Sequence, residues 1–404
     1  MAEDPAYSEL FDDEPRATPV AADEYREATG ETLERTLDLA TWQDTPDFQQ
    51  IYDRMSAEVA EAVEQEKRAR NVVRDVIFPK LGSQPGAPES AGVYQATPAQ
   101  IEQKHRGVLL NGKIEACDGT AATHDTLVLT VTQLGVCLTS YRGEHLTLSQ
   151  RLFRRDLRAA GGTDTEAEVL ELLRRRSRRS APGEEDRRDT VTELMRRGIV
   201  SYAERAVLLD RSTAPWRLGH GTLIPHELIT GAGSMELLTA ALELLRRFVH
   251  EQKRFVYVPS TNRDRLLLSI GDALRPLEYA IVETNGSRLQ KIVEGGHYGK
   301  EHGPKALEFA KEIGPEVLTG VYRASMQCPA NVFIAHRDFV HDAALIAMAD
   351  SALQEHRGFP LLIDLAHNVV NAAFGSATFN DIIRTAYADV GRPYEFLTER
   401  ETRV

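Results

Sequence analysis

The sequence predicts an α/β fold: a mixed β-sheet core flanked by helices, with a helical extension at the N-terminus. Two observations lead to this prediction. Segments 108–116 and 126–141 are rich in Val, Leu, Ile and Thr, which favour strands, and they follow each other closely enough to pair. Further short apolar segments then alternate with amphipathic helical patterns as far as residue 374. A pair of strands followed by alternating helices and strands is typical of a mixed sheet covered by helices.

The N-terminal part differs from this core. Residues 1–30 are expected to form a disordered acidic arm, because residues 1–50 hold fourteen acidic side chains against three arginines. The arm is either a solvated tail or a segment that docks on a partner or competes with DNA. Residues 31–104 are expected to form a helical extension, with a Gly/Pro/Ser-rich loop at 82–96 and a short helix at 98–105. Its apolar residues recur at four-residue steps: Ile51, Met55, Val59 and Val63.

The core is expected to span residues 105–390, followed by a tail at 391–404. An arginine-rich helical insertion follows the paired strands, at about 149–205. After it, a short strand at 206–209 is expected to end at Asp210. The other expected strands are 255–259, 279–283, 316–323 and 331–334, and the other expected helices are 234–251, 341–356 and 365–374.

Composition limits the class of protein. No run of about 18 apolar residues occurs, so no membrane span is expected, and the acidic N-terminus does not have the pattern of a signal peptide. Cys117, Cys137 and Cys328 lack CxxC spacing, which argues against a disulfide framework and a zinc site and favours the reducing cytoplasm. Most of the net charge of −13 falls in the first 50 residues. The body is therefore close to neutral, and its basic patches leave DNA binding open.

Two carboxylates follow apolar segments at distant points of the chain. Asp118 ends the run IEACD and precedes a glycine, and Asp210 ends the run AVLLD. Carboxylates at neighbouring strand ends can share a divalent metal ion, and either Glu193 or Glu204 on the expected preceding helix could add a third oxygen ligand. An Asp-Gly turn or a helix cap would give the same patterns without any metal.

A late segment, GFPLLIDLAH, adds an acid and a histidine. Asp364 and His367 are three residues apart and share one face if the helix begins near them. This pair suits a metal ligand combined with a group that transfers a proton or contacts phosphate. The alternative is a core histidine bonded to a backbone carbonyl.

Six basic residues are candidates for DNA contacts: Arg174, Arg175, Arg176, Arg263, Lys291 and Lys300. The first three belong to the run LLRRRSRRS, and the two lysines flank a Gly/His-rich segment. Clustered cations of this kind favour phosphate binding. A solvated helix face, balanced by nearby glutamates, is the other interpretation.

Taken in order, these motifs resemble those of the NurA nuclease family. The matching segments are Asp118-Gly119-Thr120 after a strand, a helix with Glu193, Leu208-Leu209-Asp210 with Ser212, and Gly358-Phe359-Pro360 with Asp364 and His367. Each motif is weak on its own, and the ordered set is more specific. The resemblance covers roughly residues 105–375.

This resemblance implies an RNase H-like core and a deoxyribonuclease that uses Mn²⁺ or Mg²⁺ at DNA ends. It implies metal ligation by Asp118, Glu193 and Asp210, with Asp364 and His367 in the same catalytic site. The implied partners are DNA, a second copy of the chain and a hexameric ATPase of the HerA/FtsK type, in DNA repair or phage defence. Two departures stand out: Phe359 replaces the tyrosine of the family, and Arg263 is the candidate replacement for a lysine.

Two rival functions remain open. An actin-like or sugar-kinase-like phosphotransferase also places Asp-Gly-Thr after a strand, but the residues after Thr120 lack the glycine-rich phosphate hairpin that such an enzyme needs. A non-enzymatic scaffold that clamps DNA for a translocase is favoured by Phe359, because a hydroxyl is missing there. A cleavage assay with and without Mn²⁺ separates this scaffold from a nuclease.

Overall fold

The structure is a computed structural model. It describes residues 21–42, 48–84, 86–126, 129–143, 145–155, 166–167, 169–170, 192–296, 298 and 301–395. The chain forms two compact units that meet in sequence between Arg68 and Ala69. The larger unit therefore begins inside the segment expected to be a helical extension. Within the described residues, no helix is long and apolar enough to cross a membrane.

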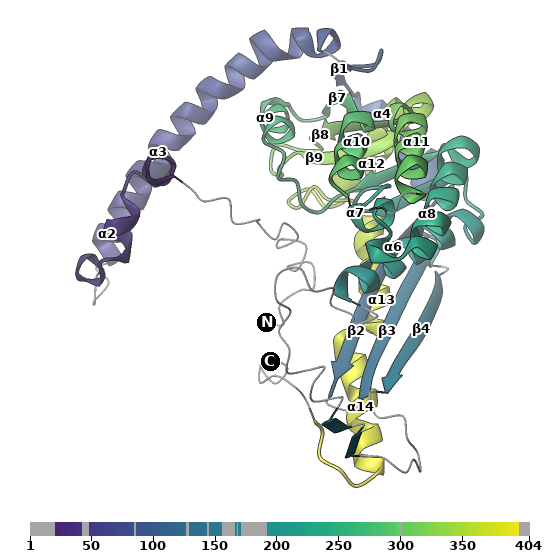
Figure 1. Cartoon of the computed structure of the whole chain (residues 1–404). Coiled ribbons are helices and arrows are strands. Elements are labelled where there is room, and N and C mark those ends of the chain that lie inside the picture. The colour runs from purple at the N-terminus through teal and green to yellow at the C-terminus, as the bar shows by residue number, and fades with distance from the viewer. Residues whose placement is uncertain are drawn as a thin grey trace. The chain divides into compact units, whose positions relative to one another are not determined.

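One mixed β-sheet runs through the larger unit (Figure 1). Its order is β1 (Gly92–Gln95), β7 (Glu278–Thr284), β8 (Val317–Tyr322), β9 (Asn331–His336), β6 (Phe255–Val258), β5 (Trp216–His220), β2 (Ile114–Asp125), β3 (Leu129–Thr139) and β4 (His145–Arg155). The long strands β2, β3 and β4 are antiparallel neighbours, and β2, β5 and β6 are parallel. The predicted α/β fold with a mixed sheet flanked by helices is confirmed.

Helices cover both faces of this sheet. On one face, α4 (Pro98–Lys104), α12 (Val340–Ala352) and α13 (Leu361–Phe374) pack on alternate strand residues such as Ala116 and Leu218. On the other face, α6 (Glu193–Asp210), α8 (Met235–Arg247) and α11 (His302–Ile313) pack on residues such as Cys117 and Tyr257. Strand side chains alternate between faces, so even-numbered residues of β2 point toward α13 and odd-numbered ones toward α6.

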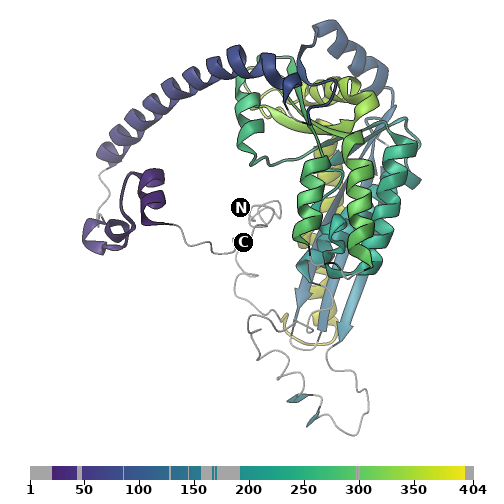
Figure 2. The same ribbon diagram turned by 45° about the horizontal axis from the view of Figure 1, so that its top comes forward.

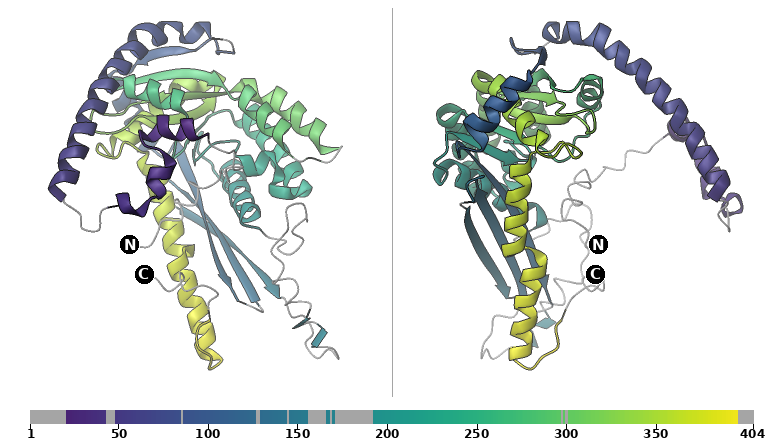
Figure 3. Two further views of the ribbon diagram at one scale, coloured as in Figure 1. Left: turned by 60° about the vertical axis from the view of Figure 1, so that its left-hand side comes forward. Right: turned by 180° about the vertical axis from the view of Figure 1, so that it is seen from behind.

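The last two helices follow the long strands. Helix α13 packs on β2 and β3, and α14 (Ser376–Asp389) continues along β2, as Figures 2 and 3 show from several sides. The ring of Phe374 packs directly on the backbone of Gly135. A Cβ at this position would lie only 2.5 Å from the ring, so a larger residue would not fit. Three further described helices of the larger unit are α7 (His226–Ile229), α9 (Arg265–Ala273) and α10 (Gly286–Gly295).

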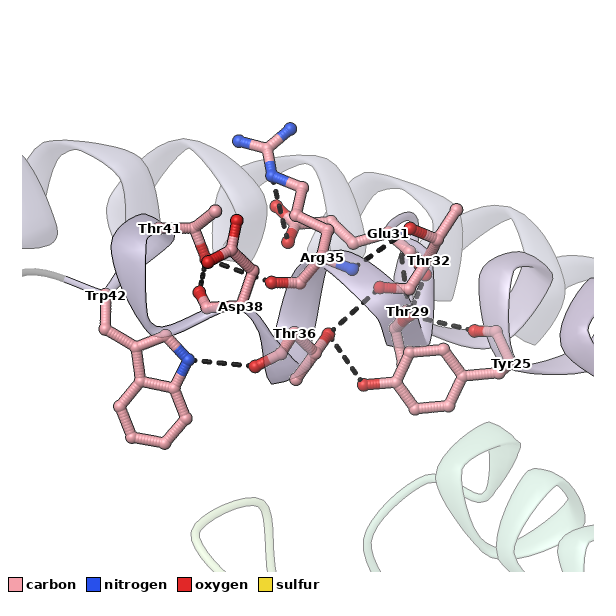
Figure 4. A network of polar contacts seen from close by, with 9 residues as sticks. All are labelled: Tyr25, Thr29, Glu31, Thr32, Arg35, Thr36, Asp38, Thr41 and Trp42. Atoms are coloured by element: carbon pink, nitrogen blue, oxygen red, sulfur yellow. Dashed lines mark hydrogen bonds and ion pairs between the residues drawn. The ribbon is translucent and has the colours of Figure 1, made fainter.

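The smaller unit contains α1 (Ala22–Thr29), α2 (Leu33–Leu37) and most of α3 (Phe48–Val72). Figure 4 shows the polar contacts that hold its first turns: the Tyr25 hydroxyl donates to Thr36 Oγ1 at 3.0 Å, and Trp42 Nε1 donates to the Thr36 carbonyl at 2.8 Å. The disorder expected for 21–30 is therefore wrong, whereas residues 1–20 lie outside the described part. Helix α3 buries none of its residues, so its apolar stripe is exposed.

Several expected elements differ from those observed. Residues 149–155 belong to β4, and not to a helix, because they pair with β3 along its whole length. Strand β1 lies in the segment expected to be a loop, and β5 was not foreseen. The expected strand at 206–209 is the last turn of α6. Its apolar residues pack as a helix face, and a short apolar run cannot be told from a buried helix end by periodicity.

Candidate functional site

Asp118 lies in the middle of β2 rather than at its end, because β2 continues in register with β3 as far as Asp125. On the other side, β2 runs parallel to β5, with Cys117 opposite Gly219. The next residues of the two strands, Asp118 and His220, therefore stand side by side. Both point to the face covered by α13.

Two imidazoles bind the Asp118 carboxylate. His220 Nδ1 lies 3.2 Å from Oδ1, and His367 Nδ1, delivered by α13, lies 2.8 Å from Oδ2. On the far side of the ring, His367 Nε2 is 2.8 Å from Asn371 Nδ2. An amide nitrogen can only donate, so in this arrangement Nε2 accepts and Nδ1 carries the proton that it donates to Asp118. Asn371 and Asp118 together fix the orientation of His367.

This carboxylate is nearly inaccessible, with 3% of its side chain exposed. Burial alone would raise the pKa of Asp118, but the hydrogen bonds from His220 and His367 outweigh burial and lower that pKa to about 2. The site therefore keeps an ionised, oriented carboxylate in the centre of the sheet at neutral pH.

His220 is a site residue that the sequence prediction missed. The signal that could have found it is a repeat: Asp118-Gly119-Thr120 in β2 has a counterpart, His220-Gly221-Thr222, at the end of β5. Because the two strands are parallel neighbours, equal motifs in them place their first residues together. His220 was overlooked because only carboxylates were considered as candidates at the strand ends.

Glu204 approaches β2 from the opposite face. A Cβ at Gly119 would lie 2.6 Å from Glu204 Oε1, so the glycine makes room for this carboxylate. Burial raises the pKa of Glu204 to about 7, against the lowering effect of the Arg205 charge. Of the two glutamates considered from the sequence, Glu204 is thus the one beside Asp118.

Arg205 holds the surroundings of Glu204 in place. Its guanidinium is 2% exposed and donates to Glu204 Oε2 at 3.1 Å. It also donates to the carbonyls of Ser201 at 2.7 Å, Leu223 at 2.8 Å and Thr222. Since Thr222 and Leu223 follow His220 closely, this one side chain ties the end of β5 to α6.

Glu193 and Asp210 are not brought to Asp118, contrary to the sequence-based prediction. Glu193 is an exposed residue in the first turn of α6, and it lies about 16 Å along the helix axis from Glu204. Asp210 ends the same helix and forms a surface ion pair with Arg247 at 2.7 Å. The prediction for Asp210 depended on a strand at 206–209, which is helical instead, and the prediction for Glu193 depended on the resemblance.

Asp364 shares α13 with His367 but serves another part of the structure. Its Oδ2 accepts from Gln354 Nε2 and from Arg357, each at 2.6 Å. Phe359 is 7% exposed, and its ring meets the His220 ring edge to face with centroids 6.0 Å apart. The residue that replaces the family tyrosine therefore forms a wall of the Asp118 site, whereas Asp364 supports the turn before α13.

The basic residues predicted to contact DNA either lie far apart in sequence or fall outside the described residues. Arg263 is exposed in the loop before α9, and Lys291 is exposed on α10. Arg174, Arg175, Arg176 and Lys300 lie outside the described residues. DNA contact by these side chains stays a prediction.

The donor set fits a divalent metal ion only if substrate completes the coordination. Among the described residues, no three His, Cys, Asp or Glu side chains are placed to hold an ion by themselves. Mg²⁺ is commonly bound by one or two carboxylates together with substrate phosphates and water, so a closed protein cage is not required. Asp118 is the oxygen ligand suited to such a shared ion, because carboxylates suit both Mg²⁺ and Mn²⁺.

A second buried carboxylate stands where α12 meets α13. Asp350 is fully buried and accepts from the Leu362 N–H at 3.0 Å and from the Tyr141 hydroxyl. Burial raises the pKa of Asp350 to about 7; the two hydrogen bonds oppose this rise, and the charge of Asp364 adds to it. An ordinary aspartate has a pKa of 3.8.

This shift predicts how stability depends on pH. Between about pH 4 and pH 7 the folded protein retains a proton on Asp350 that the unfolded chain has lost, so the free energy of unfolding falls as pH rises, by on the order of 4 kcal/mol. Asp350→Asn carries no charge and escapes this loss. Denaturant unfolding of both proteins should show the variant gaining stability relative to the wild type from pH 4 to pH 7. A difference that does not change with pH would contradict the assignment.

No family model and no curated protein matches this sequence. The fold is similar to that of solved NurA structures. The NurA nuclease from Sulfolobus solfataricus is 11% identical, with 85% of this chain and 99% of that chain covered and a TM-score of 0.42. A second NurA structure is 8% identical, with 87% and 99% covered and a TM-score of 0.46. NurA bound to dAMP and manganese is 10% identical, with 88% and 99% covered and a TM-score of 0.38. These structures carry the name of the family that the sequence motifs resemble.

Proposed function

We propose that this chain is a metal-dependent deoxyribonuclease that hydrolyses phosphodiester bonds at DNA ends and in single strands. The observation that supports it is the Asp118 site: a buried, ionised carboxylate in the central strand, oriented by His220 and His367. Mn²⁺ or Mg²⁺ is the proposed cofactor, and Asp118 would be the residue that holds it together with the substrate. Such an ion supplies charge neutralisation and a water of lowered pKa.

The chain's own residues contribute preorganisation. Asp118 is fixed by donors from two different elements, so little reorganisation is needed when a phosphate and its counter-ion approach. His367 is held in turn by Asn371. Phe359 covers His220 on one side and limits the access of water there.

The proposed setting is the cytoplasm, where the chain forms a homodimer and docks on a HerA/FtsK-type hexameric ATPase in DNA repair or phage defence. The sequence has no GxxxxGK[ST] loop, so a motor that feeds DNA would have to be a partner. The exposed apolar residues of α3, such as Met55 at 62% and Val59 at 59%, are candidates for a covered surface in that assembly. Light scattering at micromolar concentration should give the mass of a dimer, and a strictly monomeric mass would contradict this part of the proposal.

The activity can be tested directly. Purified protein is incubated with end-labelled duplex and single-stranded DNA in Mn²⁺, in Mg²⁺ and in EDTA. Release of nucleotides or short fragments is expected with a divalent ion and not with EDTA. Equal cleavage in EDTA would exclude metal dependence, and intact DNA in every condition would contradict the nuclease.

A catalytically weak scaffold that clamps DNA for a translocase is the second candidate. It is favoured by two observations: Glu204 is neutralised by Arg205, and a histidine rather than a carboxylate stands beside Asp118. The scaffold predicts that DNA is bound but stays intact in the cleavage assay. In that case, His220→Asp should create a carboxylate pair and with it Mg²⁺-dependent cleavage. The scaffold hypothesis predicts this gain of activity, and the nuclease hypothesis does not.

A further inference from the structure

We propose that Asp350 is a positioning residue, which holds the first turn of α13 so that His367 meets Asp118. The inference rests on the proposed nuclease function where it concerns cleavage. Asp350 does not contact Asp118 or His367 in any described hydrogen bond, so its effect must pass through α13. Three features of the α12–α13 joint support it.

The first feature is the start of α13. The residue before the helix is Pro360, whose side chain cannot accept a hydrogen bond from the free N–H groups of the first turn. Asp350, near the end of α12, supplies the acceptor instead, at 3.0 Å from the Leu362 nitrogen. Asp350 therefore does for α13 what an N-cap residue does in other helices.

The second feature is the link to the sheet. The other oxygen of Asp350 accepts from the hydroxyl of Tyr141, which follows the end of β3. Strand β3 is the antiparallel neighbour of β2, with Cys137 directly opposite Asp118. One carboxylate thus joins the start of α13 to the strand pair that carries Asp118. His367 comes five residues after Leu362 on the same helix.

The third feature is the packing around the joint. Asp364 also faces Asp350, and its own charge is paired with Arg357. Tyr322, whose hydroxyl bonds to Ser351 at 2.7 Å, also lies near Asp350. Asp350 is 0% exposed among these groups, so removing its side chain leaves the Tyr141 and Leu362 donors without their acceptor. The helix start is then free to shift.

The experiment compares Asp350→Ala with Asp350→Asn, which keeps the shape and an acceptor for the Leu362 N–H. The matched control is Asp342→Ala, on the same helix but with 52% of its side chain exposed. Two quantities are measured: kcat and KM for a labelled duplex, and the proton resonance of His367 Nδ1. A displacement of about 1 Å at a catalytic group can lower the rate by roughly 100-fold. Asp350→Ala should lower kcat on that scale at unchanged KM and shift or broaden the His367 resonance, while Asp350→Asn and the control resemble the wild type.

Wild-type kcat and an unshifted resonance in Asp350→Ala would overturn the proposal, and so would a failure of Asp350→Asn to restore them. If Asp350→Ala does not fold, Tyr141→Phe is used instead, because it removes one of the two donors to Asp350. This variant should shift the His367 resonance, and an unshifted resonance in it would also overturn the proposal. The resonance reports the contact between His367 and Asp118 without any cleavage. Its result therefore stands even if no form of the protein cuts DNA, which would contradict only the proposed function.

Discussion

Asp118→Asn is expected to lower the rate of DNA cleavage by at least about 1,000-fold, equivalent to about 4 kcal/mol on the barrier. The substitution keeps the size of the side chain but removes the charge that would share a metal ion with phosphate. It also replaces one of the two acceptors that hold His220 and His367. Steady-state cleavage of labelled duplex at saturating Mn²⁺ measures the effect, and circular dichroism checks that the fold is kept.

The matched control is Asp210→Asn, because the sequence alone ranks the two aspartates equally and the structure does not. Asp210 is half exposed in a surface pair with Arg247, which is worth at most about 1 kcal/mol in stability. Its replacement should leave cleavage and folding close to those of the wild type. Equal losses of cleavage in both variants would show that Asp210 belongs to the site. Cleavage at the wild-type rate by Asp118→Asn would show that Asp118 does not belong to it.

Arg205→Met should destabilise the folded protein by about 3–5 kcal/mol, the range for breaking one partner out of a buried ion pair. The substitution leaves the Glu204 carboxylate buried without its cation and three carbonyl groups without a donor. Denaturant unfolding, followed by tryptophan fluorescence, gives the free energy of unfolding. Arg247→Met is the control, because its ion pair is exposed and should cost no more than about 1 kcal/mol.

A second substitution tests the physical cause. Glu204→Gln in the Arg205→Met background removes the buried charge, so it should recover part of the lost stability. The recovery should grow as pH rises from about 4.5, the ordinary pKa of a glutamate, to above 7, because the loss of the Arg205 charge raises the pKa of Glu204 further. If the double variant is as unstable as Arg205→Met at every pH, the loss comes from the carbonyl groups and not from Glu204.

The central part of the site was predictable from the sequence, and its surroundings were not. Asp118 follows a strongly β-forming run, and His367 follows a Gly-Phe-Pro turn, and the structure brings these two together. Asp210 misled because an apolar run of four residues fits a strand and a buried helix end equally well. The choice of Glu193 came from the family resemblance, and the length of α6 places Glu204 rather than Glu193 beside β2.

His220 and Asn371 were missed for different reasons. His220 depends on the pairing of β5 with β2, and strand neighbours far apart in sequence cannot be read from local patterns. Asn371 lies one helical turn after His367, so its spacing was visible, but its role follows only from the direction of the imidazole ring. Gly119 had a visible role as a position for close approach, and the structure shows that the approaching group is Glu204.

The distance in sequence between the two halves of the site has a consequence for the synthesis of the protein. Asp118 and His367 are separated by 249 positions, and the chain between the end of β2 at Asp125 and the start of β5 at Trp216 must be made before these two strands can pair. Contacts of such long range form late and slow the folding of a domain. Chains fold from the N-terminus as they leave the ribosome, so the sheet can assemble while its carboxylate still lacks the second imidazole. The proposed nuclease would therefore be unable to cut DNA until α13 has emerged and docked.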